Sequence, residues 1–166
     1  MAELTTTRMS LRIPTEIFAA LKAEAALQRP ELQTGDHIQN ILATAAIASG
    51  QMDPNVEARL RARMYVLEQA GLLALSIVEK GEFDEHLTLN VFRQIMDDPA
   101  LRSSYETAVG GDAYVPKLPG KTPFNMHMGW QIKNAVSAHV LNDENGKPRK
   151  VNVKDEPIQS YTLLKL

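Results

Sequence analysis

Polar and apolar residues alternate strictly near the start of the chain, within Thr5–Ile13. Successive side chains of a β-strand point to opposite faces, so this alternation predicts a strand with one polar and one apolar face. Pro14 ends the strand and is favourable in the first turn of a helix. The polar positions are Arg8, Ser10 and Arg12, and the apolar positions are Met9, Leu11 and Ile13.

Two amphipathic helices are predicted after this strand. The first ends at Gln28-Arg29-Pro30, and the second ends at Ser49-Gly50. Thr34 or Asp36 is expected to cap the second helix, because short polar side chains accept hydrogen bonds from the first helical amides. Helical spacing puts several apolar residues on one face of each helix. They are Ile17, Phe18, Leu21 and Ala25 in the first helix, and Ile38, Ile41, Leu42 and Ala45 in the second.

A long helix is predicted from Pro54 to Lys80, with Asp53 as its cap. Its last turns are apolar nearly all round, which indicates burial on most sides. Two interpretations stay open: a core helix within one chain, or a helix that contacts another subunit. The alternating spacings of four and three residues define a short heptad-like seam. The seam comprises Leu60, Met64, Leu67, Gly71, Ala74 and Val78.

The rest of the chain predicts shorter helices and then strands. Helices are expected near Thr88–Met96, from Asp98-Pro99 to Gly110-Gly111, and over Phe124–Ser137. Strands follow at Ala138–Leu141, Lys150–Lys154 and Ile158–Leu164, with a hairpin turn at Asn145-Gly146. The predicted fold class is therefore mainly α with a small antiparallel β contribution. We expect three regions, namely residues 1–50, 51–111 and 112–166, the second for assembly and the third of unknown role.

Composition narrows the class of protein. The 166 residues are 44% hydrophobic and 23% charged, close to the averages of globular proteins. No apolar stretch approaches the roughly 20 residues that a bilayer span needs, and the N-terminus does not resemble a signal peptide. The absence of cysteine excludes disulfides and thiolate metal sites. We therefore expect a cytoplasmic protein without membrane contact, whose few aromatic residues (5%) favour oligomerisation.

Charge is unevenly distributed. Residues 49–98 contain five basic and nine acidic residues, whereas residues 99–166 contain nine basic and six acidic residues. Much of the C-terminal excess comes from Lys147, Arg149, Lys150 and Lys154. This cluster is either a solvated turn and strand edge or a surface that faces phosphate, with Lys147, Arg149 and Lys150 as a secondary DNA contact.

The predicted N-terminal strand needs a partner, because an isolated strand leaves its backbone groups unpaired. The next hundred residues offer no such strand, but a second copy of the chain does. Two strands then form an antiparallel ribbon, and the helices of both chains cover its apolar face. A two-stranded ribbon fits the major groove of B-DNA, where arginine pairs with guanine and serine donates or accepts a hydrogen bond.

The segments RMSLRIPTEIFAALKAEA and TGDHIQNILATA, within residues 5–48, resemble the ribbon-helix-helix family of DNA-binding proteins. The resemblance implies that Arg8, Ser10 and Arg12 read bases. It also implies that the start of the second helix grips a DNA phosphate, as helix N-termini attract anions. The residues at this start are Thr34, Gly35, Asp36 and His37.

These observations favour a sequence-specific double-stranded DNA-binding protein that forms a homodimer or a tetramer. Transcriptional regulation is the first expected use, and an accessory role in plasmid transfer or partition is a close variant that needs the same DNA contacts. The alternative is an antitoxin or other interaction module that uses the ribbon mainly to dimerise, with a protein partner on the C-terminal region. We expect no enzyme, since no nucleophile, base and orienting group occur together. No cofactor or metal site is expected either, since the histidines lack metal-ligand spacing.

Overall fold

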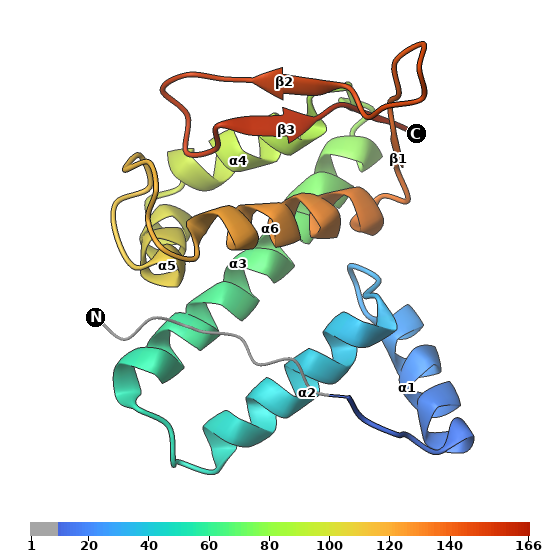
Figure 1. Cartoon of the computed structure of the whole chain (residues 1–166), viewed down its shortest axis with the longest axis vertical. Coiled ribbons are helices and arrows are strands. Elements are labelled where there is room, and N and C mark those ends of the chain that lie inside the picture. The colour runs from blue at the N-terminus through green and yellow to red at the C-terminus, as the bar shows by residue number, and fades with distance from the viewer. Residues whose placement is uncertain (1–9) are drawn as a thin grey trace.

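The computed structural model describes residues 10–166, which form a mainly helical fold with two small antiparallel sheets. This agrees with the fold class expected from the sequence at that coarse level. Figure 1 shows two helices at one end of the molecule, a long helix through its middle, and the sheets at the other end. The helices are α1 (Thr15–Leu27), α2 (Thr34–Ala48), α3 (Pro54–Glu79), α4 (Leu87–Asp97), α5 (Pro99–Val109) and α6 (Lys121–Ala135). The strands are β1 (His139–Val140), β2 (Lys150–Asn152), β3 (Ser160–Thr162) and β4 (Leu164–Lys165).

The long helix α3 begins where the sequence predicts. The Asp53 carboxylate accepts hydrogen bonds from the backbone N–H groups of Asn55 and Val56, at 2.9 and 3.3 Å. Pro54 occupies the first helical position, where its missing N–H removes no helical hydrogen bond. Helices α4, α5 and α6 all pack against α3. The C-terminal half of α3 is therefore a core helix within one chain.

The buried face of α3 overlaps the predicted seam only in part, at Gly71 and Ala74. Val66, Ala70, Ala74 and Ile77 are buried, whereas the seam residues Leu60, Met64, Leu67 and Val78 are only partly covered. The reason is that both α5 and α6 pack on α3, so the buried face also includes Val66, Ala70 and Ile77, which lie off the seam. Gly71 is the seam position with a clear steric role. A Cβ atom there would meet the ring of Pro30, so glycine permits the close approach of the α1–α2 connection.

One hydrophobic core unites the helices α3–α6 with the strands. The rings of Phe92, Tyr105 and Phe124 pack in sequence at its centre, with centroids about 6 Å apart. The guanidinium of Arg63 lies 4.7 Å from the centroid of the Phe124 ring. The core extends from Val66 to Leu164, so it draws on both predicted regions, 51–111 and 112–166.

The strands pair in an order that the sequence does not predict. Strand β1 pairs with the last strand, β4, and β2 pairs with β3. The predicted strand Ile158–Leu164 divides in two, because the chain changes partner from β2 to β1 at Leu163. The turn at Asn145-Gly146 lies where expected. Gly146 there has a left-handed φ of 76°, and the Asp143 carboxylate accepts from the N–H of Asn145.

The N-terminal part contains the two predicted helices, α1 and α2. The predicted strand Thr5–Ile13 falls largely outside the described residues, and residues 10–14 form no strand. The loop between the helices packs through the buried ring of Pro30. Within residues 10–166, none of the helices is long and apolar enough to cross a membrane.

Candidate nucleic-acid interface

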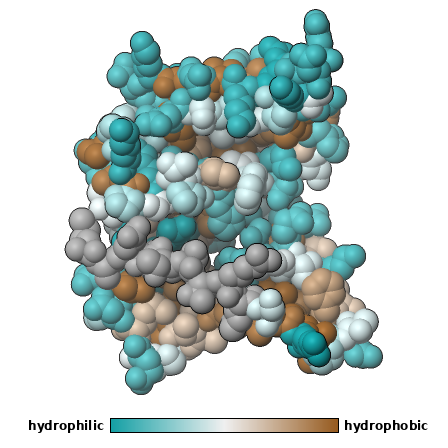
Figure 2. Space-filling model, in the orientation of Figure 1, coloured by the Kyte–Doolittle hydropathy of each residue, from teal (hydrophilic) through white to brown (hydrophobic). Residues whose placement is uncertain are grey.

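The pair of helices α1 and α2 leaves an apolar surface open. We call the side chains of Leu11, Ile17, Phe18, Ile41 and Leu42 the open face. Their exposed fractions range from 42% to 55%. The described contacts bury no residue of α2 at all, and in α1 they bury Ala25 alone. Figure 2 shows hydrophobic surface over these helices at the bottom of the molecule.

The open face follows from the amphipathic patterns of the two helices. The predicted apolar stripes are present, but the contacts with the rest of the chain, such as Pro30 with Gly71 and Asp36 with His127, bury no residue of α2. Helices α1 and α2 also contact each other. Two short helices without a third layer form half of a core, because each amphipathic stripe needs a surface to pack against.

Of the residues predicted to read bases, the described ones flank Leu11 of the open face in the sequence. Ser10 and Arg12 are exposed, and Arg8 lies outside the described residues. Ile13 is partly buried, and Pro14 precedes the first turn of α1. The polar positions of the alternating segment are therefore accessible to solvent as far as they are described.

The start of α2 differs from the prediction of a side-chain cap. The capping position is Gln33, and no side chain of residues 10–166 accepts from the first amides, so the cap predicted at Thr34 or Asp36 is wrong. The Asp36 carboxylate is instead paired with His127 of α6, whose Nε2 lies 3.3 Å from the Asp36 Oδ1. Gly35, which lies between Thr34 and Asp36 in the sequence, is exposed. Within the described part of the chain, the first amides of α2 thus have no side-chain acceptor of the capping type.

His37 has a structural role at the same end of α2. Its Nε2 lies 3.3 Å from the Glu24 carboxylate of α1, and its side chain is only 12% exposed. Its backbone N–H donates to the carbonyl of Gln33. Among the four predicted phosphate-binding positions, His37 is therefore engaged within the chain, whereas the amides of Thr34, Gly35 and Asp36 precede the first helical hydrogen bond.

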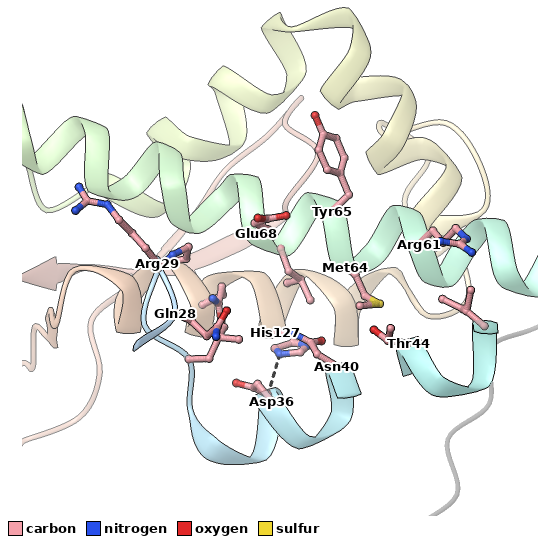
Figure 3. Close-up of a pocket in the computed structure, with 15 residues that line it drawn as sticks. Gln28, Arg29, Asp36, Asn40, Thr44, Arg61, Met64, Tyr65, Glu68 and His127 are labelled. Carbon is pink, nitrogen blue, oxygen red and sulfur yellow. Dashed lines mark ion pairs between the residues drawn. The ribbon is translucent and has the colours of Figure 1, made fainter. Parts of the chain in front are cut away.

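A cavity of about 420 Å³ separates the helix pair from α3 and α6. Figure 3 shows Asp36 and His127 facing each other at this cavity, with Glu68 and Arg61 from α3 on its other side. Basic and acidic groups both line it. The sequence gives no signal for the Asp36–His127 pair, because 91 positions separate two residues that only the tertiary fold brings together.

The basic C-terminal residues lie far from the helix pair. Lys147, Arg149 and Lys150 are exposed on the turn before β2 and on β2 itself. Figure 1 shows this strand at the opposite end of the molecule from α1 and α2. One chain therefore does not combine Lys150 with Arg12 into a single surface. No group of three or more potential metal ligands occurs among residues 10–166.

Comparisons with known proteins give no relative for this chain. No family model, no curated protein and no solved structure matches it.

Proposed function

We propose that the chain is a sequence-specific double-stranded DNA-binding protein that works as a homodimer. In this proposal residues 8–13 of two copies pair as an antiparallel ribbon, and the helices α1 and α2 of both copies close a shared core beneath it. The observation that carries the proposal is the open face, which begins at Leu11 within the alternating segment and continues onto α1 and α2.

The exposed fractions of the open-face side chains are those expected when one chain supplies half of a hydrophobic core that a second copy completes. Fully burying a large apolar side chain stabilises by about 1.5–3 kcal/mol. Roughly half of each open-face side chain is still exposed, so a second copy would gain about 1 kcal/mol for each one it covers. Five such side chains per chain provide a substantial part of the free energy that dimerisation requires.

Polar groups near the open face would provide the contacts with DNA. Arg8, Ser10 and Arg12 would project from one face of the ribbon into the major groove, where arginine pairs with guanine O6 and N7. The amides at the start of α2 would bind a phosphate and fix the register of the complex. The Asp36 carboxylate does not oppose this role, because it is directed to His127 rather than to the helix end.

The proposed DNA contacts suit two biological roles. We propose a cytoplasmic transcriptional regulator or a plasmid transfer or partition accessory factor, since both use the same ribbon. The region α3–β4 would carry further assembly, up to a tetramer, or a protein partner.

The test is selection of bound fragments from a random duplex library by the full-length protein. We expect enrichment of one sequence motif. Arg12→Ala should then lose about 1–3 kcal/mol on the selected site and less on a scrambled duplex. Lys80→Ala, which removes an exposed charge at the end of α3, is the control and should bind both duplexes normally. A dimer without any enriched motif would contradict DNA reading and favour the antitoxin or interaction-module alternative.

A further inference from the structure

A second cavity, also about 420 Å³, lies between α6 and the β2–β3 sheet. Figure 1 shows α6 running beside these strands, with the α5–α6 loop at one end. Met126, Trp130 and Lys133 line the cavity from α6, where spacings of four and three residues put them on one face. Lys150 and Thr162 are register partners in the sheet, and both line the opposite wall. Regular elements thus build both walls.

The charged side chains that line this cavity are all basic. Four lysines line it, namely Lys117 from the loop, Lys121 and Lys133 from the two ends of α6, and Lys150 from β2. No aspartate or glutamate lies among its lining residues, although the whole chain has 20 acidic and 18 basic residues. Charges of one sign around a concave surface concentrate the field and attract ions of the opposite sign.

Two buried polar side chains add fixed hydrogen-bonding groups. Lys121 is 7% exposed, and its ammonium donates to the carbonyls of Ala113 and Val115, which hold it in place. Burial lowers the pKa of Lys121, and the nearby Asp112 partly opposes this effect. Thr88 is also 7% exposed and lines the cavity, and no hydrogen bond within residues 10–166 uses its hydroxyl. This hydroxyl can donate a hydrogen bond to a ligand in the cavity or accept one from it.

The cavity also contains an exposed aromatic surface. Trp130 is 60% exposed and Met126 is 54% exposed, although both are large apolar side chains. An indole ring offers a flat face on which another ring stacks, and a thioether adds a polarisable contact. Stacking of a nucleobase on such a ring is worth about 1–3 kcal/mol. The cavity therefore combines an aromatic platform with an excess of positive charge.

We propose that this cavity binds a small aromatic anion of the mononucleotide class. The ring stacks on Trp130, and the phosphate lies among the ammonium groups of Lys117, Lys133 and Lys150. The volume lies within the range of roughly 300–1,000 Å³ of small-molecule pockets. This site lies away from the proposed ribbon and from α1 and α2, and it shares only Lys150 with the predicted secondary DNA contact.

The experiment uses the fluorescence of Trp130, which is the single tryptophan of the chain. Full-length protein without DNA is titrated with adenosine 5′-monophosphate, with adenosine and with inorganic phosphate, and calorimetry checks each titration. We expect saturable binding of the monophosphate and at least tenfold weaker binding of the other two probes, because each lacks one half of the recognition. Lys133→Glu should weaken the monophosphate at least tenfold. Lys154→Glu makes the same charge change outside the cavity and should alter its affinity less than twofold.

Further variants separate stacking from charge. Trp130→Ala, followed by calorimetry, should weaken the monophosphate but leave inorganic phosphate unchanged, and a normal melting temperature shows that the variant folds. If Lys133→Glu disturbs folding, Lys133→Gln replaces it. Absence of saturable monophosphate binding in the millimolar range would overturn the proposal, as would equal losses for Lys133→Glu and Lys154→Glu. Binding of a short single-stranded oligodeoxyadenylate without binding of the monophosphate would also overturn it and assign the cavity to a nucleic-acid strand.

Discussion

Leu11→Lys tests whether a second copy of the chain covers the open face. Leu11 is 55% exposed within one chain. For a protein that stays monomeric, a substitution at such an exposed site changes the free energy of unfolding by about 0.5 kcal/mol or less. The same substitution inside a shared core has a much larger effect, because it removes the leucine contacts and buries an ammonium group.

The magnitude follows from the exposed fraction. A partner that covers the remaining half of Leu11 stabilises by about 1 kcal/mol per chain, and both chains of a dimer lose that term. Burial of the unpaired ammonium costs several kcal/mol more. We therefore expect Leu11→Lys to weaken dimerisation by at least 3 kcal/mol, which is more than a hundredfold in the dissociation constant.

The assay is sedimentation equilibrium together with thermal unfolding at several protein concentrations. The wild-type protein should be dimeric or larger, with a melting temperature that rises with concentration. Leu166→Lys is the matched control, since Leu166 is 59% exposed at the other end of the chain, and it should leave both readouts unchanged. A wild-type monomer, or a Leu11→Lys variant with unchanged mass and melting, would refute the shared core.

Three further predictions concern other parts of the molecule. Gly71→Ala should lower the free energy of unfolding by about 1–3 kcal/mol in denaturant titrations, because its Cβ would overlap the Pro30 ring, and an unchanged midpoint would contradict that contact. Burial raises the pKa of Tyr105 in the folded chain. The contribution of Tyr105 to the free energy of unfolding is therefore fully present below pH 10, and it is lost above pH 10, where the tyrosine of the unfolded chain ionises first. Stability should fall there by up to about 1.4 kcal/mol per pH unit, and Tyr105→Phe should flatten this fall; equal slopes would exclude Tyr105 as the cause. If β2 contacts DNA, Lys150→Ala should weaken selected and scrambled duplexes alike and reduce the salt slope by about one, whereas unchanged titrations would remove Lys150 from the interface.

The sequence correctly predicted those elements that depend on interactions between residues close together in the chain. The start of α3 depends on Asp53, Pro54 and two amides within three residues of the cap, so the sequence contains the whole arrangement. The turn at Gly146 is similar, because a left-handed residue and a neighbouring carboxylate suffice to define it. In both places no distant contact competes with the local preference.

The wrong or missing predictions have tertiary causes. Asp36 is a good capping residue by type, but His127 lies close enough in the fold to take its carboxylate. The heptad-like seam of α3 predicts only part of its buried face, because α5 and α6 both pack on this helix, whereas a seam assumes one partner helix. The pairing of β1 with β4 joins His139 to Lys165 across the intervening strands β2 and β3. None of these contacts leaves a periodic signal in the sequence.

The two ends of the molecule differ in how much of their stability lies within one chain. The helices α3–α6 close around buried aromatic rings such as Phe92 and Tyr105, whereas the described contacts bury no residue of α2. A region with few buried apolar contacts opens at low free energy unless a partner covers it. Dimerisation, and any DNA that binds the dimer alone, would therefore stabilise α1 and α2 much more than the rest of the chain. Amide hydrogen exchange should accordingly slow in α1 and α2 as protein concentration rises, while exchange in α4 and α5 stays constant; uniform slowing throughout the chain would contradict this division.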